Sequence, residues 1–360
     1  CTANLPISDD IDPAQTDDNI PIKQFGVVTY TGNASTNNIT GLNFKPDLVW
    51  IKIRNTASNA VLVDSTRGTN KMLHPNNTND EVTTANLTSF NSNGFSLDGT
   101  SDYQANYNGN GNTYVAWCWR ANGGTTASNS DGDITSTIQA NTNAGFSIVK
   151  FTSNNSSNQT VGHGLGAIPR FILVKPLTGG GWSWWVYHYN DGTLGYLKLA
   201  GADSFTTGTA GFGAHPTSSV FTMGSVGNSM PNDTSTEVIA YVWADVEGFQ
   251  KFGTYEGNGS ADGTFIYTGF RPRMVFLKQI DGAAEWTVFD TARETHNQME
   301  DILQWDLDNA ETQLANDKID FLSNGFKLRG AGGGRTNQSG RTFVYGAWGD
   351  VSFKYGNTFP

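Results

Sequence analysis

The sequence contains few charged residues, few cysteines and no long apolar run. Charged residues make up 15% of its 360 positions, against roughly 25% in an average globular protein. Cys1 and Cys118 are too few for a disulfide framework, and we predict that Cys118 is a buried free thiol. No segment approaches the roughly 18 consecutive apolar residues of a membrane span, and no signal peptide is visible. The sequence therefore predicts no contact with a membrane.

Positive charge is also scarce, because 22 Lys and Arg stand against 33 Asp and Glu and leave a formal net charge of −11. An acidic chain without a Lys/Arg cluster does not favour nucleic acid, whose phosphates require a basic surface. What the sequence has instead is 42 glycines, loops crowded with Asn, Ser and Thr, and 10 Trp, 12 Tyr and 21 Phe. This composition is typical of extracellular and virion-surface β proteins.

One phrase occurs three times and organises the chain. A proline opens a run of large apolar residues and a lysine closes it, at residues 46–52, 169–175 and 272–278. Proline is tolerated at the first residue of a strand, where its missing N–H is not needed. The nearly continuous apolarity indicates a strand that is covered on both faces. We therefore predict one buried strand in each copy.

The segments around this strand also recur. An upstream strand begins at Phe25, Phe146 and Phe249, and each copy closes on a strand rich in aromatic residues. The closing lysines are 123 and then 103 residues apart, far more than a solenoid repeat of roughly 20 to 50 residues. We predict an all-β fold of three tandem antiparallel β-sandwich repeats, jelly-roll-like, in an arrangement that can be pseudo-threefold.

The repeats are predicted at residues 25–121, 146–248 and 249–360. Residues 1–24 are acidic and without periodicity, which indicates a linker or arm. A first residue Cys1 fits a processed product, the ordered part of a longer chain, or a mature lipoprotein.

Two further segments interrupt the repeats. Residues 122–145 predict a polar linker with an edge strand at 134–138. Residues 294–303 are the one helix candidate, because their apolar residues Met299, Ile302 and Leu303 would share a helical face.

The sequence carries no enzyme signature. Its five histidines are scattered without metal-ligand spacing, and neither a nucleophile elbow nor a P-loop is present. We predict no catalysis, no cofactor and no metal, although a glycan depolymerase stays open because any two acids can meet in space. Asn129, Asp131 and Asp133 alternate like the start of a calcium loop, but the downstream glutamate is missing. An Asx-rich turn is the alternative.

A second spacing recurs at a strand end. Asp64 lies three residues before Arg67, and Asp290 lies three residues before Arg293. We predict a local ion pair that stabilises a turn in each of these two copies. The middle copy has His188 and Asp191 there instead. This exchange hints at specialisation of the middle copy.

The strongest feature of a single copy is the aromatic stretch at residues 182–189. On a strand of period two, Trp184 and Val186 share one face with His188, and we expect that face to lie in the core. The opposite face should then turn outward or toward a neighbouring unit. Aromatic rings with polar tips suit both sugar rings and protein interfaces. Our candidates for glycan contact are Trp182, Trp185, Tyr187 and Tyr189; packing between units and contact between subunits are the alternatives.

Several longer phrases carry a resemblance. They include VVTYTG at residues 27–32, GLNFKPDLVWIK at 41–52, VDSTRG at 63–68 and TSFNSNGF at 88–95, with later counterparts at residues 160–166, 257–263 and 321–328. The sequence resembles a family of tail-fibre-like virion proteins of marine tailed phages, over nearly the whole chain from Phe25 onward. The resemblance implies a place at the tail or adsorption apparatus and supplies no catalytic residue.

We therefore expect a virion structural protein of the tail fibre or adsorption apparatus that binds a host-surface glycan or receptor. Its expected location is the virion surface, and its expected partners are the host glycan, other virion proteins and further copies of itself, for example in a trimer. The alternatives are an architectural capsid decoration or fibre shaft protein, the glycan depolymerase and a lipoprotein adhesin.

Overall fold

The computed structural model describes residues 21–84, 87–226 and 235–349, and across these residues the chain is all-β. Regular helical structure in them is limited to two short 3₁₀ turns, η1 (Pro21–Lys23) and η2 (Gln104–Asn106). No helix of this described part is long and apolar enough to cross a membrane. Cys1 and most of the predicted N-terminal arm lie outside the described residues.

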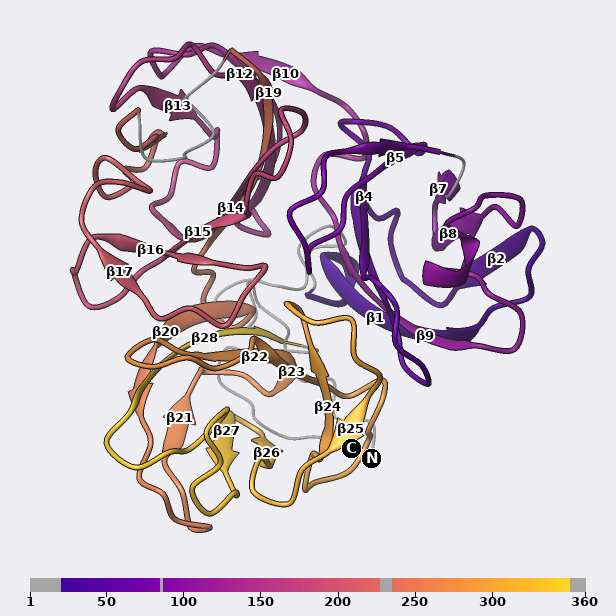
Figure 1. The fold of residues 1–360 in the computed structure, drawn as a ribbon, viewed down its shortest axis with the longest axis vertical. Coiled ribbons are helices and arrows are strands. Elements are labelled where there is room, and N and C mark those ends of the chain that lie inside the picture. Colours follow the sequence, from indigo (N-terminus) through magenta and orange to yellow (C-terminus); the bar gives the residue numbers. More distant parts are fainter. Residues whose placement is uncertain (1–20, 85–86, 227–234, 350–360) are drawn as a thin grey trace, which may run out of the picture.

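Three antiparallel sheets share one strand order, and we call them the main sheets of units 1, 2 and 3, at residues 25–121, 122–248 and 249–349 (Figure 1). In each, the closing strand lies between the upstream strand and the strand of the proline phrase, which then pairs with a fourth strand. In spatial order, the main sheet of unit 1 contains β1 (Phe25–Thr31), β9 (Thr113–Trp119), β3 (Leu48–Ile53) and β4 (Val61–Asp64). That of unit 2 contains β12 (Phe146–Thr152), β19 (Glu237–Ala244), β14 (Pro169–Pro176) and β15 (Trp185–His188). That of unit 3 contains β20 (Gln250–Glu256), β28 (Thr342–Gly349), β22 (Pro272–Gln279) and β23 (Thr287–Asp290).

Each unit also has a small outer sheet, which lies farther from the centre of the molecule than the main sheet (Figure 1). The outer sheet of unit 1 contains β2 (Asn37–Thr40), β8 (Gly94–Leu97) and β7 (Leu87–Asn91), and that of unit 2 contains β13 (Thr160–Gly162) and β18 (Val220–Thr222). The outer sheet of unit 3 contains β21 (Phe265–Tyr267), β27 (Gly325–Leu328) and β26 (Ile319–Leu322). The remaining strands extend the main sheets or pair locally: β5 (Lys71–Met72), β6 (Val82–Thr83), β10 (Ala127–Asn129), β11 (Ser136–Asn141), β16 (Gly195–Lys198), β17 (Thr206–Thr207), β24 (Asp301–Gln304) and β25 (Thr312–Gln313).

The prediction of a buried strand behind each proline is confirmed. Strands β14 and β22 begin at Pro169 and Pro272, and β3 begins two residues after Pro46. All six residues of β3 are buried. The proline therefore marks the strand start because no ladder donor is required there.

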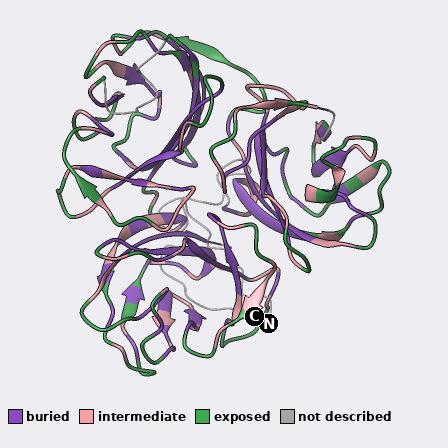
Figure 2. Ribbon diagram, in the orientation of Figure 1, coloured by how far each residue is buried: buried purple, intermediate pink, exposed green. Residues whose placement is uncertain are grey.

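The main sheets are apolar on both faces because each separates two cores. On β3, Leu48 and Trp50 belong to a central core that all three units share, whereas Val49 and Ile51 belong to an outer core of unit 1. Units 2 and 3 have outer cores of their own, built between main and outer sheet. Figure 2 shows the buried residues gathered along the strands that face the centre and the exposed ones on the peripheral loops.

Three tryptophans meet in the central core. Trp119, Trp243 and Trp348 occupy equivalent places on the closing strands β9, β19 and β28, and their ring centroids are 5.5 to 6.3 Å apart. Such edge-to-face aromatic pairs add about 0.5 to 1.5 kcal/mol each to the burial of their area. One residue from each unit therefore joins the units at the centre.

The predicted alignment of the upstream strands is wrong by one residue in unit 3. Phe25 lies opposite Trp119 and Phe146 opposite Trp243, but the residue opposite Trp348 is Gln250. Phe249 precedes the strand and still packs into the central core. The sequence pattern misleads here because a phenylalanine on either side of the strand start can reach this core.

The predicted helix at residues 294–303 is also wrong. Its C-terminal part is the strand β24, in which Ile302 faces the outer core of unit 3 and Leu303 faces the central core. A strand between two cores presents apolar residues on both faces, which imitates part of a helical pattern over so short a stretch.

The predicted linker at residues 122–145 contributes strands to unit 2. Strand β11 pairs with β12 but begins two residues later than the edge strand predicted at residues 134–138, and it is not the edge, because β10 lies beyond it in the sheet. Strand β10 pairs with its outer side. This segment therefore widens the sheet of unit 2.

Candidate functional site

The predicted aromatic stripe does not form an outward surface. Trp185 and Tyr187 are only 2% exposed and lie in the outer core of unit 2, where Trp185 packs on Tyr196 and Tyr187 on Phe212. The expectation that they face outward or toward a neighbouring unit is wrong, because the outer layer of their own unit covers them. It is the opposite face, with Trp184, that reaches the shared central core.

The other two glycan candidates lie at the two ends of β15. Trp182 and Tyr189 are half-buried. The carbonyl oxygen of Trp182 accepts a hydrogen bond from Lys175, and the guanidinium of Arg170 lies 4.1 Å from the ring centroid of Tyr189. The structure therefore does not bring the four predicted residues together on one surface.

The Asn129 segment forms the predicted Asx turn. The side-chain oxygen of Asn129 accepts a hydrogen bond of 3.0 Å from the backbone N–H of Asp131. The carboxylate of Asp133 accepts bonds from both the backbone and the hydroxyl of Thr160, and these bonds lower its pKa. Within the described residues, no group of three or more His, Cys, Asp and Glu side chains could hold a metal ion.

Cys118 is a buried free thiol, as predicted, and burial raises its pKa. The two predicted Asp/Arg pairs are also confirmed. The nitrogen Nε of Arg67 lies 2.5 Å from the carboxylate of Asp64, and the corresponding distance between Arg293 and Asp290 is 2.6 Å. In both pairs the aspartate also accepts bonds from backbone N–H groups of the following turn.

These aspartates also join one unit to the next. The hydroxyl of Tyr241 in unit 2 donates a bond of 2.7 Å to Asp64 in unit 1, and Nε1 of Trp117 in unit 1 donates one of 3.0 Å to Asp290 in unit 3. In unit 2 the equivalent His188 approaches the Tyr345 carbonyl of unit 3 at 2.9 Å. Each pair of units therefore has one such contact.

The lysines that close the proline phrases make a second set of contacts between the same three pairs of units. Lys52 donates to the Leu307 carbonyl of unit 3 at 2.7 Å. The other two bonds, both 3.0 Å long, run from Lys175 to Thr78 and from Lys278 to Ala202. Burial lowers the pKa of all three lysines to about 8. We call these cross-unit contacts the contact ring, since together they join unit 1 to unit 3, unit 3 to unit 2 and unit 2 to unit 1.

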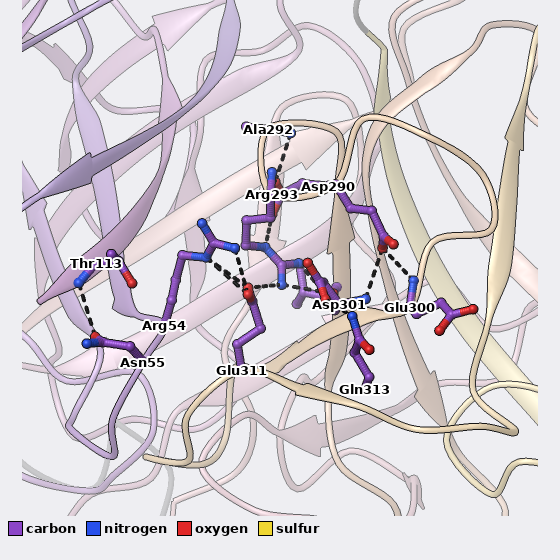
Figure 3. A network of polar contacts seen from close by, with 12 residues as sticks. Arg54, Asn55, Thr113, Asp290, Ala292, Arg293, Glu300, Asp301, Glu311 and Gln313 are labelled. Carbon is purple, nitrogen blue, oxygen red and sulfur yellow. Dashed lines mark hydrogen bonds and ion pairs between the residues drawn. The ribbon is translucent and has the colours of Figure 1, made fainter.

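A charged network strengthens the junction between units 1 and 3 (Figure 3). Glu311 accepts bonds of 2.6 and 3.0 Å from the guanidinium of Arg54 in unit 1 and one of 2.9 Å from Arg293 in its own unit. Burial opposes the charge on Arg293, but Asp290 and Glu311 outweigh it and raise the pKa of Arg293. A backbone hydrogen bond occurs at the equivalent place of each junction between units. The N–H groups of Glu311, Glu81 and Phe205 donate to the carbonyls of Arg54, Leu177 and Ile280, respectively.

An exposed aromatic pair that the sequence analysis missed lies on the outer strand β21. Phe265 is 43% exposed and Tyr267 is 59% exposed, while Ile266 between them is buried. The ammonium group of Lys251 lies 5.4 Å from the ring centroid of Tyr267, and Lys327 pairs directly with Phe265 across the strands. We call Lys251, Phe265, Tyr267 and Lys327 the β21 surface; β21 is at the outer side of unit 3 (Figure 1).

The β21 surface has no counterpart in the other units. The strand pairing aligns the buried Ile266 with Ile39 and Val161, because each faces the phenylalanine of the neighbouring strand. In the order Lys251, Phe265, Tyr267, Lys327, the equivalent residues are Gly26, Asn38, Thr40 and Ser96 in unit 1, and Ser147, Thr160, Gly162 and Thr222 in unit 2. Two cations and two aromatic rings thus replace small or neutral side chains in one unit only.

Comparison with known proteins identifies the family. The model of a domain of unknown function, DUF7483, matches residues 20–351. The chain belongs to this family. No curated protein matches it, and no solved structure matches it.

The DUF7483 match spans all three units, so the contact ring and the β21 surface both lie inside the family domain. The sequence did contain a signal for the β21 surface. Aligning the short outer strands of the three copies would have placed Phe265 and Tyr267 against polar residues and glycine.

Proposed function

We propose that this chain is a non-enzymatic structural protein of a phage particle, at the tail fibre or adsorption apparatus, and that it binds a glycan or receptor on the host surface. The long phrases that resemble tail-fibre-like virion proteins support the location. The β21 surface supports the binding role, since exposed aromatic rings beside cations suit recognition of polar partners with apolar faces.

The observation that carries the proposal is the contrast between two sets of positions. Residues of the contact ring have a counterpart in every unit, as Lys52, Lys175 and Lys278 illustrate. The aromatic rings and lysines of the β21 surface, in contrast, occur in unit 3 alone. We interpret the three units as tandem copies of one β-sandwich around a pseudo-threefold centre, in which common positions hold the scaffold and a unique position meets the partner.

The test compares phage particles that carry Tyr267→Ala with wild-type particles. We expect particles of normal morphology and yield that adsorb to host cells at least tenfold more slowly. Thr40→Ala, at the equivalent exposed place in unit 1, is the matched control and should adsorb normally. Normal adsorption by Tyr267→Ala and Phe265→Ala particles would overturn the proposal.

A purely architectural role is the second candidate, and the closed contact ring favours it. A capsid decoration or fibre shaft protein needs rigidity and no ligand, and each junction of the ring combines buried polar bonds with the shared apolar core. This role predicts poor assembly when the surface is altered and unchanged adsorption per assembled particle. The same particles therefore separate the two functions.

A further inference from the structure

We propose that the β21 surface binds an acidic saccharide, with one sugar ring stacked on Tyr267 and its carboxylate at Lys251. This inference rests on the proposed function for its biological role, since it names the chemical class of the host partner. The binding event itself can be tested on the purified chain.

The two aromatic rings form a platform of suitable spacing. Phe265 and Tyr267 are two residues apart on one strand, so both side chains point to the same face, roughly 7 Å apart along it. Their exposed fractions of 43% and 59% leave ring surface open. Pyranose rings present C–H groups on one face, which pack on an aromatic ring, and the hydroxyls around them stay hydrated. Two neighbouring sugar units of one chain can therefore cover both rings.

The charges around the platform select the acidic class. Lys251 lies over the Tyr267 ring, and its charge also acts on Asp245, whose ion-pair partner is Arg170 at 3.6 Å. Lys327 is paired with Asp262 at 2.5 Å, and Arg329 with Asp320 at 2.5 Å. With Arg170 and Asp245 included, four cations thus meet three carboxylates, a local excess of positive charge on a chain whose net charge is −11. A neutral sugar would leave this excess unused, whereas a uronate or similar acid would meet Lys251.

Two other classes of partner fit less well. Nucleic acid would meet one uncompensated cation here on an acidic chain, and its affinity depends on several phosphate contacts. A peptide that adds a strand needs a long free edge, but β21 has only three residues, and short edges resist such pairing. The saccharide needs neither an extended edge nor a large basic area.

The experiment measures binding of the purified full chain to alginate oligosaccharides, which are uronate chains, and to neutral cello-oligosaccharides of the same length, by calorimetric titration. We expect binding of the uronate at least tenfold tighter than that of the neutral probe. The uronate affinity should fall severalfold between 50 and 300 mM salt, roughly as screening of a partly exposed charge requires.

Three variants locate the site. Tyr267→Ala should lower uronate affinity about tenfold or more, and Phe265→Ala should do so to a similar degree. Lys251→Gln should lower uronate affinity about tenfold with little change for the neutral probe, and Lys251→Arg should restore most of it. Thr40→Ala is the control in unit 1, and a melting curve for each variant checks the fold.

Each contrary outcome overturns the inference. Equal affinity for both probes without salt dependence rejects the acidic class, absence of uronate binding rejects the ligand, and unchanged binding by Tyr267→Ala rejects the place. The proposed function fails separately: particles with Tyr267→Ala that adsorb normally refute it even when the purified chain binds uronate through Tyr267. Conversely, slow adsorption by these particles without uronate binding refutes only the ligand class.

Discussion

The buried lysines of the contact ring predict a distinctive dependence of stability on alkaline pH. Lys278 donates bonds of 3.0, 3.0 and 2.7 Å to the carbonyls of Ala202, Gln279 and Ala284. Burial lowers its pKa from 10.5 to about 8, although the carboxylates of Asp306, Asp203 and Glu285 oppose this shift. The folded chain therefore gives up the proton at a lower pH than the unfolded chain.

The sign follows from proton counting. Between pH 8 and pH 10.5 the unfolded state holds more protons at this lysine than the folded state, so the free energy of unfolding rises with pH. With a folded pKa of about 8, the increase between pH 8 and pH 10 is about 2 kcal/mol. Lys278→Met removes this increase, because methionine does not titrate.

The assay is equilibrium unfolding in guanidinium, followed by tryptophan fluorescence at pH 8, 9 and 10. The difference in unfolding free energy, wild type minus Lys278→Met, should grow by about 2 kcal/mol over this range. Contributions from tyrosines, Cys118 and the other lysines cancel in the difference. Lys150→Met, which removes a surface lysine paired with Glu237, is the control. Parallel profiles for wild type and Lys278→Met would refute the reasoning.

Two further substitutions test other parts of the structure. Tyr241→Phe removes the hydroxyl that donates to Asp64 across the junction of units 2 and 1, and we expect a loss of roughly 1.5 to 3 kcal/mol in unfolding free energy; a loss below about 0.5 kcal/mol would argue against a buried bond there. Trp185→Ala should lower stability by about 3 to 5 kcal/mol, because this ring is a core residue of unit 2. A stable Trp185→Ala protein with selectively impaired binding would instead restore its predicted role as a ligand contact.

The sequence predicted the repeated strands well because two independent signals coincide there. Proline fixes the strand start, and continuous apolarity marks a strand with a core on each side. The same property defeated the prediction for the face of Trp185. When both faces of a strand are buried, alternation no longer separates inside from outside, and the single-copy aromatics were assigned to the surface.

The candidate site was harder to predict for a related reason. The outer strands have only three to five residues, too few for periodicity to be informative. Exposure of Phe265 and Tyr267 follows from their position on the outer sheet, which only the strand pairing reveals. Lys251 reaches Tyr267 from the main sheet, and no spacing along the sequence encodes that contact.

The geometry of the units also explains why unit 2 lacks such a surface. Its equivalent of Tyr267 is Gly162, and a Cβ atom there would lie 1.6 Å from the side-chain oxygen of Asn129 on β10. The strands that widen unit 2 therefore cover the place where an aromatic ring would stand. In unit 1 the equivalent Thr40 is exposed, so a tyrosine could be accommodated. Because β10 and β11 belong to the segment that joins the main sheets of units 1 and 2, this connection restricts the position to units 1 and 3. Only unit 3 carries the rings.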